Sequence, residues 1–223
     1  VKTAPLPFTT STLQQEAAKV LNFSTQKTMR LAQQLYEGID LKNSGTVGLI
    51  SYLRTDSTRI SKEADKAARD YIREQYGKEY EARVGTTDNK NKNSQDAHEA
   101  IRPTDVTRIP VIMKESLSRD QFRLYQLIWK RFVASRMETA SYETMSVRIK
   151  GGKYYFHVSS SRVKFDGFLS VYVQEEDKKK NNHTQLKGIE EGTILTLQKF
   201  NREQHFTQPP AHYTEASLVK TLE

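Results

Sequence analysis

Cysteine is absent from all 223 residues, which excludes disulfide bonds and thiolate metal sites and favours a reducing compartment. No stretch approaches the roughly 20 apolar residues of a membrane span, and the first residues form no apolar signal segment, so we expect no membrane partner. The five histidines are scattered without ligand spacing, and no acidic cluster of the Asp-x-Asp-x-Asp kind occurs. We therefore expect this chain by itself to hold no metal or other cofactor.

Two further absences concern the energy source and the extent of the chain. The sequence has no phosphate-binding loop of the Gly-Lys-Ser kind, so ATP bound at such a loop would not drive its chemistry. It begins with Val1 and not with Met, which suggests a piece excised from a longer polypeptide.

Positive charge is in excess. The chain has 35 Lys and Arg against 27 Asp and Glu, a net charge of +8. This excess favours a polyanionic partner, and nucleic acid is the first candidate. A plain basic surface has the same net charge, so charge alone does not identify the partner.

The first two-thirds of the chain is predicted to be helical. A capping-box pattern at residues 11–14 places one helix start at Ser11, and Ser24 and Ser61 open two more helices. A second capping box, at residues 118–121, opens the longest helix. Its stripe of Tyr125, Ile128 and Phe132 is typical of a core. In the first three helices we expect these residues to face inward: Leu13, Ala17, Val20, Leu21, Met29, Ala32, Leu35, Tyr36, Ala64, Ala67, Ala68, Tyr71 and Ile72.

After about residue 140 the hydrophobic period changes to two. Residues 142–149 alternate, Gly151 and Gly152 supply a hairpin turn, and residues 154–160, 168–173 and 193–200 continue the strand pattern. A last helix begins near Tyr213. The fold class is therefore α+β. It comprises a helical domain over 1–140, a β-rich segment over 141–206 and the start of a further helical segment over 207–223.

Tyr52 and Arg54 are the strongest candidates for chemistry. Residues two apart share one face of an extended strand, so both side chains would project together. A phenol has a pKa of about 10, which leaves it roughly three units too protonated at pH 7 and costs about 4 kcal/mol. A neighbouring guanidinium stabilises the phenolate and grips a phosphate, which suits a tyrosine that attacks a phosphodiester. The ordinary alternative is a strand end with a half-buried Tyr and a solvated Arg.

His98 and Arg102 form a second candidate group. A polar run at residues 85–94 reads as a mobile loop, and Asp96 is predicted to cap a short helix that Pro103 ends. On a helical turn, residues four apart share a face, so His98 and Arg102 together could hold a phosphate or protonate a leaving oxygen. An ordinary surface histidine fits the same pattern.

Four segments resemble a known family. Residues 51–58 (SYLRTDST) are similar to the active-site segment of bacterial type IA DNA topoisomerase I, and residues 95–104 (QDAHEAIRPT) resemble a second motif of that family. Residues 124–129 (LYQLIW) and 213–220 (YTEASLVK) resemble further segments. The motifs occur in the family's order across nearly the whole chain. Leu53 stands where the family often has Met, an exchange that preserves volume.

The resemblance implies a mechanism in which Tyr52 cleaves one DNA strand and becomes linked to its 5′ phosphate. The other strand passes through the gap, and the 3′ hydroxyl reseals the break, which relaxes negatively supercoiled DNA without ATP. Arg54 would stabilise the phosphate in the transition state. His98 and Arg102 would help to hold the DNA. The remaining DNA-binding candidates are Asp56, Ser57 and Thr58, which would act through hydrogen bonds and as turn or cap groups.

The resemblance also implies partners beyond this chain. The family binds Mg²⁺ in a domain that this sequence does not contain, so the remaining domains of the same polypeptide are expected partners. This chain alone would bind a single-stranded DNA segment without cleaving it. It would include part of an arch domain whose sheet is incomplete here and has an exposed edge. A cytoplasmic, nucleoid-associated protein is expected.

Two alternatives remain open. Tyrosine recombinases also combine Tyr with Arg and His, but they form a 3′-phosphotyrosine and their Tyr usually follows the Arg and His. The second alternative is a DNA-binding module without chemistry, built on the first two helices and the basic surface.

Overall fold

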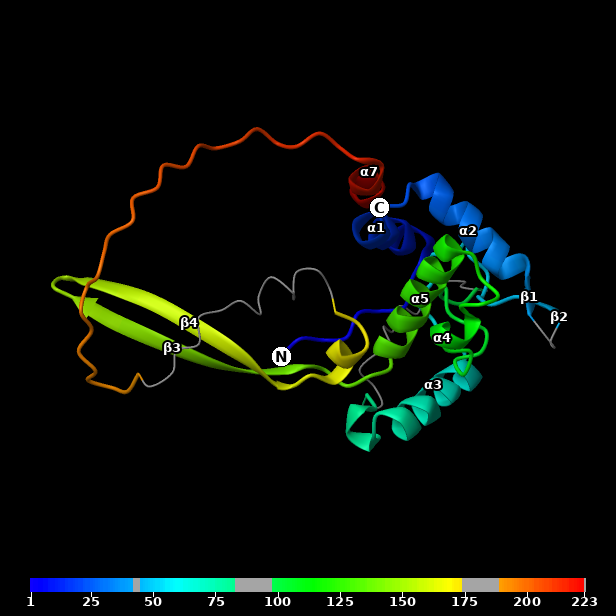
Figure 1. Ribbon diagram of the computed structural model, residues 1–223, viewed down its shortest axis with the longest axis horizontal. Helices are drawn as coiled ribbons and strands as arrows, with labels where there is room; N and C mark the ends of the chain where they lie inside the picture. The colour runs from blue at the N-terminus through cyan, green and yellow to red at the C-terminus, as the bar shows by residue number, and fades with distance from the viewer. Residues whose placement is uncertain (42–44, 83–97, 174–188, 223) are drawn as a thin grey trace.

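The computed structural model describes residues 1–41, 45–82, 98–173 and 189–222. They form a helical body from which a long two-stranded hairpin projects (Figure 1). This arrangement confirms the α+β prediction. The predicted loop at residues 85–94 and the predicted cap Asp96 lie outside the described residues.

The helical body is built around one central helix. The elements of the body are α1 (Thr10–Leu21), α2 (Thr25–Glu37), α3 (Lys62–Gln75), η1 (Lys78–Tyr80), α4 (Pro110–Met113) and α5 (Arg119–Ala134). The predicted stripe of Tyr125, Ile128 and Phe132 on α5 is fully buried, which confirms its role in the core. α5 packs against α1, α2 and α4, and Trp129 of α5 contacts the ring of Tyr71 on α3.

Serine caps define most helix starts as the sequence predicts. Ser24, Ser61 and Ser118 each accept a hydrogen bond from a backbone N–H in the first turn of their helix. The predicted start of α1 is wrong by two residues. Thr9, not Ser11, is the cap, because its extended backbone and its hydroxyl form a reciprocal capping box with Thr12.

Three residues predicted to face inward lie on the surface instead. Val20 is 40% exposed, Tyr36 is 39% exposed, and Ala67 is also exposed. α1 and α3 each bury only two residues completely, so the apolar stripe that reaches the core is narrower than the sequence pattern. Tyr36 has a specific reason for its position, since its ring packs on Tyr52.

Two antiparallel hairpins make up the strands of the described residues. The short one pairs β1 (Ile39–Leu41) with β2 (Gly45–Val47), directly after α2. The long one pairs β3 (Ser141–Gly151) with β4 (Tyr154–Phe165), and Gly152 in its turn has a φ of 61°. The predicted turn is thus confirmed, because a left-handed backbone at this position favours glycine.

Two predicted strands are wrong. Residues 168–173 overlap the short helix η2 (Gly167–Ser170), in which Phe168 is buried. The backbone N–H of Phe168 donates to the carbonyl of Glu138. Residues 193–200 form no strand, and Ile194 is 94% exposed. An alternating pattern becomes a strand only where a partner strand pairs with it, and none of the described residues pairs with 193–200.

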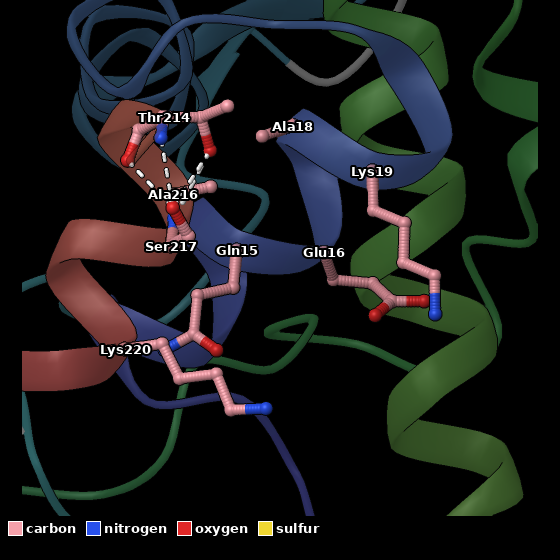
Figure 2. A pocket seen from close by; sticks show the side chains of 8 residues that line it. All are labelled: Gln15, Glu16, Ala18, Lys19, Thr214, Ala216, Ser217 and Lys220. Carbon is pink, nitrogen blue, oxygen red and sulfur yellow. Dashed lines mark hydrogen bonds between the residues drawn. The ribbon is translucent and has the colours of Figure 1, made fainter. Parts of the chain in front are cut away.

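The last helix, α7 (Glu215–Leu222), lies against α1 as Figures 1 and 2 show, and it confirms the helix predicted from Tyr213 onward. A carboxylate oxygen of Glu215 accepts hydrogen bonds from the backbone N–H and the hydroxyl of Thr25, the first residue of α2. These bonds lower the pKa of Glu215 below its usual value. Beside this contact, Gln15 and Lys220 line a groove of about 450 Å³ between α1 and α7.

Within the part of the chain that the structure describes, no helix is both long and apolar enough to cross a bilayer.

Candidate active site

The backbone around Tyr52 is held on one side by the extended segment 100–104. The Ser51 N–H donates to the carbonyl of Arg102 at 2.9 Å, and the Thr104 N–H donates to the carbonyl of Leu49 at 3.0 Å. An isolated antiparallel bridge joins Ile50 to Pro103. These contacts fix the chain immediately before the tyrosine.

The N-terminus of α1 holds the other side. The Thr10 hydroxyl donates to the carbonyl of Leu53 at 2.7 Å and accepts from the N–H of Thr55 at 2.9 Å. The Thr10 N–H also donates to the carbonyl of Thr55 at 2.8 Å. The segment that bears Tyr52 is therefore ordered by the fold itself, before any substrate binds.

Burial alternates along this segment. Leu53, Thr55 and Ser57 are 1%, 8% and 4% exposed, whereas Tyr52, Arg54 and Asp56 lie on the surface. Tyr52 and Arg54 are thus both exposed. Ile50 forms an isolated bridge, but the backbone bends at Ser51 and Leu53 and forms no regular strand. The face shared by Tyr52 and Arg54 therefore remains a prediction.

The ring of Tyr52 lies between two other aromatic rings. Its centroid is 5.5 Å from that of Tyr36 on α2, with the planes at 69°, and 5.1 Å from that of His98. Such pairs are worth about 0.5–1.5 kcal/mol each, so they restrict the orientation of the phenol. The side chain still keeps 38% of its surface exposed, which leaves it accessible to a substrate.

Gly48 permits the close approach of α2 to this segment. A Cβ at this position would lie 2.6 Å from the carbonyl oxygen of Tyr36, closer than van der Waals contact allows. The Leu49 N–H donates to the carbonyl of Leu35 at 2.7 Å. The end of α2 and the start of the Tyr52 segment are therefore joined directly, which brings Tyr36 to Tyr52.

The predicted helical turn over His98 to Arg102 is wrong. Ile101 pairs with Phe8 and Pro103 pairs with Ile50 in antiparallel bridges, so this stretch is extended and does not form a helical turn. His98 nevertheless lies against Tyr52, with the two ring centroids 5.1 Å apart.

The guanidinium of Arg102 is directed elsewhere. It donates to Glu99 at 2.6 Å and to the Pro103 carbonyl at 3.0 Å, and its side chain is only 16% exposed. His98 and Arg102 therefore do not form the shared face that their spacing predicted.

The residues after Arg54 have different surroundings. Ser57 is buried, and its hydroxyl accepts from the Arg59 N–H at 3.1 Å, an arrangement in keeping with the predicted turn group. Asp56 is exposed and Thr58 is half-buried. Arg54 and Asp56 line a depression of about 400 Å³ whose other wall is the first turn of α1. Their roles in DNA binding remain predictions.

Three supporting residues were not found by sequence reasoning. The Ser51 hydroxyl donates to the Ala100 carbonyl at 2.7 Å and accepts from the Arg102 N–H at 2.9 Å. Thr10 and Tyr36 contact the segment from distant parts of the sequence. No local pattern identifies such partners, although an aromatic residue at the edge of the predicted apolar stripe of α2 was a signal for Tyr36.

The described residues contain no cluster of three or more His, Asp or Glu side chains that could hold a metal ion.

Two comparisons with known proteins agree on the family of this chain. The sequence model of the DNA topoisomerase family matches residues 1–223. The solved structure of full-length topoisomerase I from Thermotoga maritima is similar with a TM-score of 0.74 and 38% identity, over 99% of this chain and 35% of that chain.

The chain belongs to the DNA topoisomerase family, as a piece of the bacterial type IA class. It spans about a third of the length of the Thermotoga maritima protein.

Proposed function

We propose that the complete protein cleaves and reseals one strand of DNA, with Tyr52 as the nucleophile, and so relaxes negatively supercoiled DNA without ATP. The observation that carries this proposal is the exposed phenol of Tyr52 on a backbone clamped from two sides, with an exposed Arg54 two residues further on. Enzymes place reacting groups on rigid supports in this way, because misplacement by about 1 Å costs orders of magnitude in rate.

The reaction is a phosphoryl transfer between two hydroxyl groups. The phenol oxygen of Tyr52 forms a bond to the DNA phosphorus, the bond from phosphorus to the 3′ oxygen breaks, and the phenol proton ends on the released 3′ hydroxyl. The 5′-phosphotyrosine conserves the energy of the broken bond, so the reverse attack reseals the strand without ATP. Arg54 stabilises the charge that develops on the phosphate. No carboxylate among the described residues pairs with Arg54, so its guanidinium is available.

The neighbouring side chains hold the DNA. His98 lies against the Tyr52 ring and can bind the cleaved phosphate or donate a proton nearby, and Asp56 and Thr58 contact the strand by hydrogen bonds. Arg102 supports the site through its backbone N–H, which donates to the Ser51 hydroxyl. Its guanidinium can contact DNA only when the ion pair with Glu99 is broken.

The other domains of the polypeptide complete the enzyme. We propose that they bind the Mg²⁺ and that residues 1–140, 141–206 and 207–223 belong to three structural parts. This chain then binds a single-stranded segment by itself but does not cleave it.

The test is the Tyr52→Phe variant of the complete protein, which removes only the hydroxyl. We expect no covalent DNA adduct, with the melting temperature and DNA affinity nearly unchanged, since the packing of the ring on its neighbours persists. Tyr36→Phe is the matched control, because it removes a phenol from the neighbouring ring and should leave adduct formation intact.

Adduct formation by Tyr52→Phe at the normal rate would refute the assignment. Labelling the DNA at either end also identifies the polarity of the adduct. A 3′-linked phosphotyrosine would replace the topoisomerase mechanism with that of a recombinase.

A further inference from the structure

The long hairpin has two chemically different faces. Paired residues of β3 and β4 share a face, and residues two apart along each strand continue it. One face is mainly apolar and carries Met145, Val147, Ile149, Tyr154, Phe156 and Val158. The other, which we call the polar face, carries Tyr142, Thr144, Ser146, Arg148, Lys150, Tyr155, His157, Ser159, Ser161 and Val163.

The polar face has no acidic side chain. Its cationic residues, Arg148 and Lys150, lie toward the tip together with His157, and all three are exposed. The carboxylate of the hairpin, Glu143, lies on the apolar face and pairs with Arg162 at 2.6 Å. The positive charge of the polar face is therefore not neutralised within the hairpin.

An aromatic ring lies among these cations. Tyr155 is directly opposite Lys150 and is 51% exposed, and the guanidinium of Arg148 lies 4.5 Å from the centre of its ring. Exposed rings beside cations are the means by which proteins bind single-stranded nucleic acid, since bases stack on the rings and cations contact the phosphates.

Hydroxyl groups extend this surface toward the helical body. Thr144, Ser146, Ser159 and Ser161 occupy the polar face between the tip and the base of the hairpin, and the Thr144 and Ser161 hydroxyls lie 2.8 Å apart. Ser and Thr side chains commonly donate to phosphate oxygens. From Tyr142 to Lys150 the stripe measures about 27 Å at about 3.4 Å per residue, enough for several nucleotides.

We propose that the polar face of this hairpin is a second binding surface for single-stranded DNA, separate from the segment that bears Tyr52. Charge complementarity selects this occupant, because the face combines cations, hydroxyls and a ring with no carboxylate. The apolar face has the opposite character, and a protein segment is its natural cover. The proposal does not depend on the role of Tyr52, because it concerns binding and not cleavage.

The test measures the binding of a fluorescein-labelled oligothymidylate to the complete protein over a salt series. Arg148→Gln/Lys150→Gln should weaken binding and reduce the log–log salt slope by about 1.4, that is about 0.7 for each of the two phosphates that the variant no longer neutralises. Tyr155→Ala should weaken binding about 5-fold or more because a base can no longer stack there, and Tyr155→Phe should retain most of the affinity.

A matched control removes the same charge elsewhere. Lys66 and Lys78 are exposed on the helical body, on α3 and η1, so Lys66→Gln/Lys78→Gln should leave a slope close to that of the wild type. An equal reduction of the slope in both double variants would show a general charge effect and overturn the proposal. An unchanged slope in Arg148→Gln/Lys150→Gln would also overturn the proposal. If that variant also had a lowered melting temperature, the polar face would be covered by protein and not by DNA.

Combining the hairpin variant with Tyr52→Phe keeps the two proposals distinguishable. A failed nucleophile assignment shows as a persisting covalent adduct, whereas a failed surface assignment shows in the salt slope alone.

Discussion

Arg54 illustrates how one side chain acquires a role from its surroundings. Its neighbours Leu53 and Thr55 are buried and hydrogen-bonded to Thr10, so the backbone holds the Arg54 side chain at the surface. The guanidinium of Arg102 is instead held by the carboxylate of Glu99. Because no carboxylate of the described residues holds Arg54 in this way, its guanidinium is available to a phosphate.

Replacement of Arg54 by Lys in the complete protein should reduce DNA cleavage on the order of 100-fold. The variant keeps the charge but loses the planar fork that grips two phosphate oxygens. Rates of adduct formation measured under single-turnover conditions check this expectation. Arg30→Lys, on the exposed side of α2, is the control for a general effect of the exchange. Cleavage by Arg54→Lys at the wild-type rate would mean that Arg54 is ordinary surface charge.

The helices show how short contacts join distant parts of the chain. α7 follows residues 193–214, which contain no helix or strand, yet it lies on α1 and caps α2 through Glu215 and Thr25. A carboxylate at a helix N-terminus is favourable because it accepts from free N–H groups and faces the positive end of the helix dipole. This contact is electrostatic, so it depends on the ionisation of Glu215.

The docking of α7 should weaken in acid. Hydrogen bonds from the side chain and backbone of Thr25 lower the pKa of Glu215 below its usual 4.5. A group whose pKa is lowered by folding stabilises the folded state above its unfolded pKa. That stability is lost as the pH falls through the lower, folded value. Hydrogen exchange of α7 amides, corrected for intrinsic rates, should therefore show less protection below about pH 4.5.

Glu215→Gln should show weaker protection of α7 already at neutral pH and lose this acid dependence. Glu203→Gln, which alters an exposed carboxylate before α7, should behave as the wild type. Identical acid dependence in Glu215→Gln and the wild type would assign the effect to another group.

The molecule as a whole consists of a helical body and the long β3–β4 hairpin. The body orders the Tyr52 segment, and the β3–β4 hairpin projects from the body (Figure 1). The strands of this hairpin carry basic and aromatic residues. The whole chain has a net charge of +8, which suits a polyanionic partner. It spans about a third of the length of the Thermotoga maritima protein.

The purified chain alone should bind single-stranded DNA weakly and should not relax supercoiled plasmid in the presence of Mg²⁺. Phosphate contacts release counterions, so its affinity should fall steeply with salt, by about 0.7 in log–log slope per contact. Anisotropy titrations and gel assays of plasmid topology check both statements, with the complete protein as the active control. Relaxation of plasmid by this chain would refute the expectation that other domains complete the site.

Local rules account for what the sequence predicted correctly. The caps at Ser24, Ser61 and Ser118 and the hairpin turn at Gly152 depend on residues only a few positions apart, so spacing reveals them. The family also follows from short motifs, because each is a contiguous stretch of sequence.

Contacts between distant residues decided the rest. Tyr36 and His98 contact the ring of Tyr52 from separate parts of the chain, and Thr10 is hydrogen-bonded to a segment more than 40 residues away. Residues 193–200 have a strand pattern without a strand, since no described segment pairs with them. Spacing within a sequence specifies which side chains share a face, but the packing of separate elements determines what that face meets. The stretch after His98, predicted as a helical turn, is therefore extended, because its backbone groups form hydrogen bonds with other segments of the chain.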